Sequence, residues 1–264
     1  MEFNEENIKK SYSDALEKAK KSTKGVESGS KVVLQEVTKD STDIVLDVSS
    51  ADLNNCCSPD PTLSVDQNIS FGCIRLNDLL ETNVKAGNTV IDFGSGPGHD
   101  LFMAARLVGK EGRAIGVDFT DAMIKEASSV ARKEGLTQVE LVKASIDEIP
   151  LPDNIADFII SNCVINLAFN KQKVFDEAFR LLKPGGMLID ADVISDRPLT
   201  SDIQTNNELW CSCVGGALTS EEYTENLQKS GFINVNVEYG DKNTITFDAK
   251  QFGIYSGVIL AKKP

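Results

Sequence analysis

The sequence predicts an α/β fold with a doubly wound, mostly parallel sheet. Three observations predict it. Short apolar runs alternate with helical patterns through the middle of the chain, as in proteins whose parallel strands are joined by helices. The apolar run Val90–Phe93 leads into a glycine-rich turn and then a helical pattern. A second apolar run, Ala114–Asp118, ends in a carboxylate. Together these features are typical of a Rossmann-like sheet.

The expected elements follow the hydrophobic pattern. In the core we predict strands near 89–93, 113–118, 139–143, 157–162 and 187–193, and helices near 99–108, 121–134 and 171–182. Residues 198–218 are polar and either irregular or helical. Thr219–Glu222 has the Thr-x-x-Glu pattern of a capping box, so it opens a helix, which should end at Gly231. Strands near 233–239 and 256–261 then close the sheet.

The N-terminal part has a different character. Residues 4–21 have a helical pattern, 22–30 read as a Gly/Ser/Lys-rich linker, and 52–70 as a loop. Two β-branched runs within Val32–Val48, separated by a polar turn, predict a hairpin. We therefore divide the chain into an N-terminal helical lid segment, residues 1–70, and a ligand-binding domain, residues 71–264. Within the second, 198–218 is an insertion expected to cap the substrate.

Composition limits the function classes. The chain has 264 residues, 41% of them hydrophobic, enough for one large domain with appendages. A net charge of −13 repels phosphate backbones, so nucleic-acid substrates are not expected. No apolar run has the length of a membrane span, and the N-terminus lacks the features of a signal peptide. We expect a cytoplasmic monomer whose six cysteines are thiols.

The glycine-rich turn is the first candidate binding site. Gly94, Gly96 and Gly98 give a G-x-G-x-G spacing at the end of the first core strand, where open α/β sheets bind nucleotides. In the dinucleotide fingerprint the third glycine comes one residue later. Here Pro97 also removes an N–H donor, which suits a ligand without a phosphate at this point. The alternative is that these glycines only make tight turns between strand and helix.

Asp118 supplies the other half of a nucleoside site. It ends the second core strand, 20 residues beyond Gly98. A carboxylate at this distance is placed to accept hydrogen bonds from ribose hydroxyls. The pattern therefore predicts a nucleoside-containing ligand bound across the ends of the first two core strands.

These motifs resemble those of class I S-adenosylmethionine-dependent methyltransferases. The resemblance runs from Ala86 to Asp192 and includes Asp92 before the glycine turn, Asp157–Asn162, and Leu181–Gly186 before a strand. It implies that S-adenosylmethionine (SAM) is the cofactor. The residues that it implies for cofactor binding are Asp92, Gly94, Ser95, Gly96, Gly98, Asp118, Phe119, Met123, Ser145, Ile146 and Asn162.

The cysteines carry the information about the substrate. Cys163 follows the strand at 157–162, Cys73 precedes the first core strand, and Cys213 lies in the insertion, so the three could converge above the cofactor. Any one cysteine alone is most simply a buried hydrophobe. A zinc site is disfavoured, because the chain has one histidine, His99, and no C-x-x-C pair. Three thiolates without imidazole favour a soft, thiophilic ion.

The cysteine contexts resemble those of the As(III) S-adenosylmethionine methyltransferases. The resemblance is carried by Phe71-Gly-Cys73, by Ile160–Leu167 and by Cys213–Leu218. It implies that Cys73, Cys163 and Cys213 bind arsenic, the substrate, and that Cys56 or Cys57 is a redox thiol. It also implies a thiol reductant, glutathione-like or thioredoxin, as co-substrate. The chain departs from the family at Ile74, where glycine is expected, and in the extra thiol of Cys211.

Arsenic chemistry suits these residue types. The lone pair of trivalent arsenic is the nucleophile and carries no proton, so no general base is required and His99 needs no direct chemical role. Two other function classes stay open. A methyltransferase of a small organic metabolite would keep its activity when the cysteines are replaced. A non-catalytic thiol-based metalloid binder or sensor would bind the metalloid without cofactor turnover.

Overall fold

A computed structural model describes residues 4, 10, 45–47, 76–247 and 250–264. Of the predicted N-terminal helix it describes two residues, and of the predicted hairpin three. The linker, the loop 52–70 and the cysteines Cys56, Cys57 and Cys73 lie outside the described residues.

The described elements are β1 (Val45–Asp47), α2 (Asn77–Asn83), β2 (Thr89–Phe93), α3 (His99–Val108), β3 (Arg113–Asp118), α4 (Asp121–Glu134), β4 (Val139–Lys143), β5 (Ala156–Asn162), a 3₁₀ turn (Ile165–Leu167), α5 (Lys171–Leu181), β6 (Leu182–Ser195), α6 (Ser201–Gln204), α7 (Asn207–Cys211), α8 (Ser220–Lys229), β7 (Ile233–Phe247) and β8 (Lys250–Lys262).

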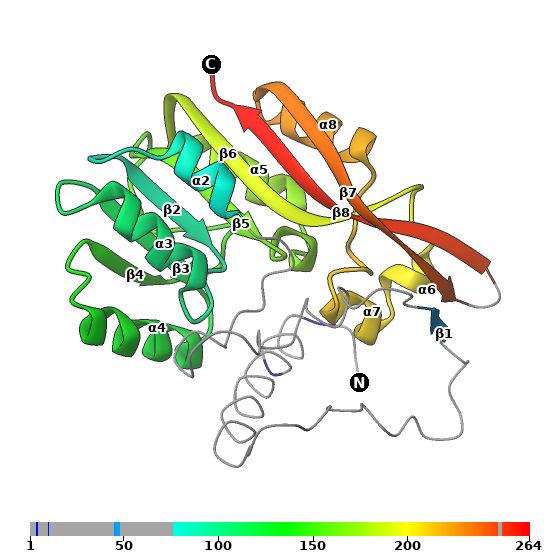
Figure 1. The fold of residues 1–264 in the computed structure, drawn as a ribbon. Coiled ribbons are helices and arrows are strands. Elements are labelled where there is room, and N and C mark those ends of the chain that lie inside the picture. The colour runs from blue at the N-terminus through cyan, green and yellow to red at the C-terminus, as the bar shows by residue number, and fades with distance from the viewer. Residues whose placement is uncertain (1–3, 5–9, 11–44, 48–75, 248–249) are drawn as a thin grey trace, which may run out of the picture.

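The strands form one mixed sheet with the order β1-β7-β8-β6-β5-β2-β3-β4. Strands β2 to β6 pair in parallel, while β8 pairs antiparallel with both β6 and β7. In Figure 1, β7 and β8 appear as the long orange and red pair that crosses the molecule. This topology confirms the predicted mostly parallel, doubly wound sheet.

Helices bury both faces of the sheet, and β2 shows why the sequence folds this way. All five of its residues are buried. Ile91 packs in a cluster with Val174 of α5 and Tyr223 of α8. Val90, its neighbour, packs in a second cluster with Leu101 of α3. Successive side chains of a strand point to opposite faces, so a strand covered on both faces reads as a continuous apolar run.

The predicted core elements are confirmed, whereas three strands are longer than predicted. β6 extends from Leu182 to Ser195, β7 from Ile233 to Phe247 and β8 from Lys250 to Lys262. The extra length of β7 and β8 and the last two residues of β6 come from antiparallel pairing between β8 and its two neighbours, which tolerates polar residues on a solvated face. The start of β6 instead pairs in parallel with β5, through Leu182 and Ala156. The capping box at Thr219 and Glu222 is present, and α8 ends at Lys229, two residues before the predicted end. β1 pairs with β7, a partner that the sequence did not predict.

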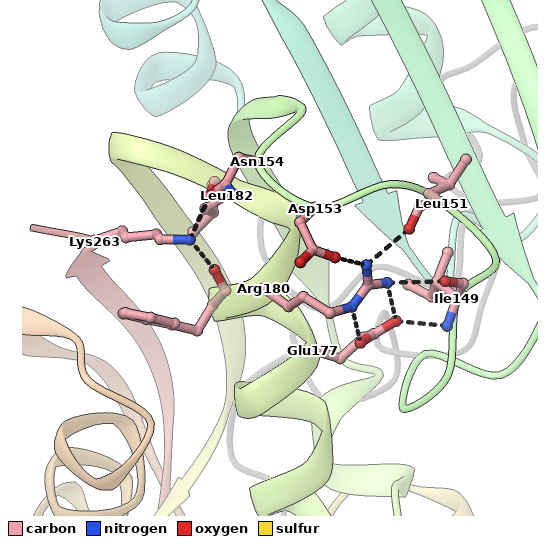
Figure 2. Close-up of polar contacts among 9 residues, drawn as sticks. Ile149, Leu151, Asp153, Asn154, Glu177, Arg180, Leu182 and Lys263 are labelled. Carbon is pink, nitrogen blue, oxygen red and sulfur yellow. Dashed lines mark hydrogen bonds and ion pairs between the residues drawn. The ribbon is translucent and has the colours of Figure 1, made fainter.

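A cluster of charged residues secures β5 at the end of that strand opposite its carboxyl terminus. The Arg180 guanidinium, on α5, donates to the Glu177 and Asp153 carboxylates and to the carbonyls of Ile149 and Leu151, as Figure 2 shows. These bonds raise the pKa of Arg180. Lys263 Nζ donates to the carbonyls of Phe179 and Leu182 in the same view. The loop before β5 is thereby fixed to α5, away from the carboxyl ends of the strands.

Candidate functional site

A cavity of about 700 Å³ lies at the carboxyl ends of β2, β3 and β5. Its lining residues come from the glycine turn, from the end of β3 and from the loop after β5. They are Asp92, Gly94, Ser95, Gly96, Pro97, His99, Asp100, Asp118, Phe119, Thr120, Met123, Asn162, Cys163, Val164 and Leu167. A second hollow shares Gly94, Asp118, Phe119, Val164 and Leu167 with it and adds Ser145, Ile146, Asp147, Ala168, Phe169, Asn170 and Lys173. The two form one continuous binding region.

The glycine turn has the backbone that its residue types require. Gly94 and Gly96 have φ of 67° and 51°, in the left-handed region that side chains disfavour. A Cβ on Gly94 would lie 2.4 Å from Val164 Cγ2, whereas the nearest atom to a Cβ on Gly96 is 4.0 Å away. Gly94 is therefore required for packing, and Gly96 keeps the cavity open.

Asp118 ties the glycine turn to the end of β3. Its Oδ2 accepts a hydrogen bond from Gly96 N at 3.1 Å, and its Oδ1 accepts from Thr120 N and Oγ1 at 2.8 and 2.7 Å. Burial raises the pKa of Asp118, and the hydrogen bonds from Thr120 and Gly96 oppose that rise. The carboxyl group is thus held in one orientation at the cavity wall.

Two further carboxyl groups line the same cavity. Burial, followed by the charges of Asp100 and Asp118, raises the pKa of Asp92 well above its usual range. Burial also raises the pKa of Asp100, which accepts a hydrogen bond from Asn162 Nδ2 at 2.9 Å. His99 Nε2 lies 3.9 Å from Asp100 Oδ1. Three acids around one cavity favour a cationic ligand, because a nearby positive charge offsets the repulsion that disfavours their ionised forms.

Two buried cysteines lie beside this cavity. Cys163, which lines it, is 5% exposed and Cys213 is 3% exposed. Cys213 Sγ donates to the Cys163 carbonyl at 3.0 Å. Both have left-handed backbones, with φ of 55° and 64°; the other two non-glycine residues with positive φ in the described ranges are asparagines, which tolerate that region better. Strained backbone of this kind is concentrated at functional sites.

The redox states of the described cysteines differ. Cys163 is disulfide-bonded in this structure, whereas Cys211 and Cys213 are free thiols. Metal and metalloid ligands are thiolates. Cys163 must therefore be a reduced thiolate when its sulfur binds a soft ion.

A network of buried polar groups adjoins the two cysteines. Asp192, on β6, accepts hydrogen bonds from Asn166 N and Nδ2 and from Val193 N. Burial raises its pKa to about 7. Lys171, on α5, lies with its Nζ 4.8 Å from the centre of the Trp210 ring, and burial lowers its pKa to about 8. The sequence analysis missed this network, because nothing in a strand pattern distinguishes Asp192 from an exposed acid.

Asp190, also on β6, gives a pH-dependent prediction. It is fully buried. Burial, followed by the charge of Asp192, raises its pKa well above the usual range. Because the folded-state pKa is raised, its contribution to stability is complete below the unfolded pKa of about 3.9 and is lost as pH rises through the folded pKa.

The Asp190→Asn variant stays neutral at all pH values. Its free energy of unfolding should therefore rise relative to that of the wild type as pH increases from 5 to 9. One pKa unit corresponds to about 1.4 kcal/mol. Urea denaturation at several pH values measures the difference, and parallel stability curves for the two proteins would contradict the prediction.

Comparison with known proteins places the chain in a family. A family model described as a methyltransferase domain matches residues 84–231, more than half of the chain. The chain belongs to the methyltransferase domain family. The match covers the glycine turn, Asp118, Cys163 and Cys213, so the cavity described above lies within the family's domain.

Individual methyltransferases extend the similarity. The chain is 35% identical over 242 residues to an arsenite methyltransferase of Halobacterium salinarum, covering 84% of this chain and 61% of that protein. A solved structure, an arsenic(III) S-adenosylmethionine methyltransferase from Chlamydomonas reinhardtii, matches with a TM-score of 0.62 and 28% identity, over 81% of this chain and 73% of that one. The chain spans less than two thirds of the curated arsenite methyltransferases that it matches. These similarities confirm the family resemblance seen in the sequence.

A different methyltransferase matches a smaller part of the chain. The ubiquinone/menaquinone biosynthesis C-methyltransferase of Salmonella arizonae is 35% identical over 125 residues, or 46% of this chain and 50% of that protein.

Among the described residues, no helix has the length and apolar character needed to cross a bilayer.

The structure brings together most of the residues predicted to bind the methyltransferase cofactor. All of them except Gly98 line the two hollows. Gly98 instead precedes α3 with φ of 104°, and a Cβ there would lie 2.4 Å from the Phe102 ring. Its role is in packing the turn against α3. Asp100, Thr120, Val164 and Leu167 also line the cavity but were not predicted to do so. Asp100 and Thr120 belong to no recognised motif, and the segment Ile160–Leu167 was interpreted for its cysteine rather than for cofactor contacts.

Proposed function

We propose that this protein transfers a methyl group from S-adenosylmethionine to trivalent arsenic bound by cysteine thiolates. One observation carries the proposal: Cys163 both lines the cavity beside the glycine turn and lies next to Cys213. The cavity proposed for the cofactor and a pair of buried cysteine sulfurs therefore meet at Cys163. Soft thiolates are the ligands that thiophilic ions prefer.

The residues of the cavity fit SAM. Asp118 is placed to accept hydrogen bonds from the ribose hydroxyls, and Ser145 and Ile146 line the hollow on its far side. Asp92 and Asp100 lie where the positive charges of the sulfonium and the amino group would be balanced. Gly96 leaves room for the ligand to approach the backbone. SAM supplies an electrophilic methyl group when bound.

The cysteines would hold arsenic as the substrate. We assign Cys163 and Cys213 as two ligands and Cys73, which lies outside the described residues, as the third. Three thiolates leave the arsenic lone pair directed away from the sulfurs. We propose that residues 198–218 cap this side of the site, which is supported by the hydrogen bond from Trp210 Nε1 to the carbonyl of Leu167, a residue of the cavity lining, at 3.2 Å.

The chain's contribution to catalysis would be mainly orientation. The attacking atom carries no proton, so the residues need to align the lone pair with the methyl–sulfur bond and to exclude water. The loop after β5 serves both purposes, because Cys163 holds arsenic while Val164 and Leu167 form part of the cofactor wall. Before arsenic binds, the hydrogen bond from the Cys213 thiol to the Cys163 carbonyl holds the two ligand-bearing loops together; that thiol proton would leave with a hydroxyl of arsenite as water when the As–S bond forms.

Methyl transfer would oxidise arsenic from the trivalent to the pentavalent state by two electrons. Two cysteine thiolates can return those electrons and become a disulfide, for which we propose Cys73 with Cys56, or with Cys57. A glutathione-like thiol or thioredoxin would then reduce the disulfide. Such a reductant would also free Cys163 for arsenic binding.

The decisive experiment is an incubation of purified protein with SAM, arsenite and a thiol, followed by separation of the arsenic species. The expected result is methylated arsenic together with S-adenosylhomocysteine, and neither should form when the thiol is left out. Absence of both products, despite bound SAM and arsenite, would overturn the proposal and favour a metalloid sensor.

A second candidate function is methylation of a small organic metabolite. The similarity to a quinone C-methyltransferase favours it. In that case a variant lacking Cys163 and Cys213 would still consume SAM when supplied with its substrate. Arsenite methylation is preferred because a cavity for an organic acceptor alone would not require two strained, buried cysteines.

Asp118→Ala tests the cofactor site. The substitution removes the acceptor proposed for the ribose, so SAM affinity should fall by about 1–3 kcal/mol, the range for a lost hydrogen bond to a charged group. Calorimetric titration measures the change. Asp121→Ala is the control, since Asp121 is exposed and pairs with Lys143. Unchanged SAM affinity in Asp118→Ala would rule out the assigned role.

A further inference from the structure

Asp192 lies beside the sulfur atoms of Cys163 and Cys213 and forms a group of three potential ligands with them. The Sγ atoms of Cys163 and Cys213 and a carboxylate oxygen of Asp192 all lie within 4.8 Å of one another, and all three residues are buried. Asp192 comes from β6, which lies beside Cys163 because Cys163 N donates to the Ala191 carbonyl at 2.8 Å. A polar group thus lies within reach of any atom that both sulfurs bind.

Hydrogen bonds fix the orientation of this carboxylate. Oδ2 accepts from Asn166 N at 3.0 Å, and Oδ1 accepts from Asn166 Nδ2 and Val193 N, both at 2.8 Å. The Tyr223 hydroxyl donates to Asn166 Oδ1 at 3.1 Å, which fixes the Asn166 amide in turn. A carboxylate oxygen has more than one lone pair, so Oδ2 can accept another hydrogen bond.

The chemistry of arsenite supplies a donor for that lone pair. Arsenite at neutral pH is As(OH)₃, and each thiol that binds forms an As–S bond, breaks an As–O bond and releases one water. After Cys163 and Cys213 have bound, one hydroxyl remains on arsenic in a buried site. A buried hydroxyl without an acceptor is unfavourable.

We propose that Asp192 accepts a hydrogen bond from this last hydroxyl and so completes the site that captures arsenite, before Cys73 displaces the hydroxyl as water. The inference rests on the proposed function and deepens it, because it gives the site a preference among arsenicals. Methylarsenite, CH₃As(OH)₂, loses both hydroxyls to the two cysteines and offers Asp192 no donor. Asp192 therefore favours arsenite over methylarsenite.

The test uses the Cys73→Ser chain, in which Cys163, Cys213 and Asp192 are the proposed ligand groups that remain. Affinities for arsenite and for methylarsenite are measured by titration after reduction, with and without Asp192→Asn. Arsenite should bind at least about tenfold more weakly in Asp192→Asn, the effect of losing a hydrogen bond to a charged group, while methylarsenite affinity changes less than about threefold. Asp190→Asn, an equally buried acid of the same strand, is the matched control and should change neither affinity by more than that.

The outcomes separate the two proposals. An equal loss for both arsenicals, no loss for either, or Cys73→Ser protein that binds methylarsenite but not arsenite would overturn the role of Asp192. Methylarsenite binding retained by Asp192→Asn shows that the variant is folded and that the thiol pair is intact. If wild-type protein binds neither arsenical, the proposed function itself fails.

Discussion

Replacing Cys163 or Cys213 with serine is expected to abolish methyl transfer to arsenic and to weaken arsenic binding by at least about 100-fold. Serine is similar in size, its hydroxyl at position 213 can donate the hydrogen bond that Cys213 Sγ donates, and the acceptor of that bond is the backbone carbonyl of residue 163, so the fold should persist. Its hydroxyl is hard and stays protonated at neutral pH, which makes it a poor ligand for a soft ion.

Cys211→Ser is the matched control. Cys211 is a free, half-buried thiol two residues from Cys213, but it does not belong to the group formed by Cys163, Asp192 and Cys213. Methylated arsenic is quantified for all three variants under a strong reductant, together with SAM affinity. Cys56→Ser and Cys57→Ser should still bind arsenic, since we assign them to redox chemistry. Full activity in Cys163→Ser or Cys213→Ser would remove the arsenic hypothesis.

Gly96→Val should abolish SAM binding while the sheet stays folded. The nearest atom to a Cβ on Gly96 is 4.0 Å away, and Gly96 lines the cavity, so we expect the valine side chain to occupy space that the ligand needs. We expect affinity to fall by at least about 100-fold, as measured by calorimetry.

Backbone strain must be separated from blockage of the cavity in this experiment. Gly135 provides the control, because it has a left-handed backbone with φ of 66° and ψ of 29°, no atom within 4 Å of the position that a Cβ would take, and a place at the end of α4 outside the cavity lining. Both variants should lose about 1–2 kcal/mol of stability through the left-handed backbone. Equal SAM affinity in Gly96→Val and Gly135→Val would show that the glycine turn has only a structural role.

The parallel core could be predicted because its signals are local. The bounds of β2, α3, β3, α4 and β4 were predicted to the residue. All of β2 and all but the first residue of β3 are buried, and each helix begins or ends near glycine or a capping residue. The lengths of β6, β7 and β8 could not be predicted in the same way. β7, β8 and the end of β6 depend on antiparallel pairing between segments far apart in the chain, which leaves no periodic signal beyond the buried part of each strand.

The same distinction between local and long-range signals applies to the residues of the candidate site. Residues of the glycine turn and Asp118 belong to motifs of fixed spacing, and the structure places them at one cavity. Asp192 and Lys171 become part of the site only because β6 and α5 pack beside the loop that holds Cys163. Their importance comes from burial and from charged neighbours, which a single sequence does not display.

The left-handed backbones of Cys163 and Cys213 lower the stability of the fold at the two positions whose side chains we assign to arsenic binding. Glycine at either position would adopt the same conformation without strain, so selection for stability alone would replace these residues. A sequence redesign that optimises folding on this backbone would therefore replace both cysteines early. The resulting protein would be more stable but would lack the two proposed arsenic ligands.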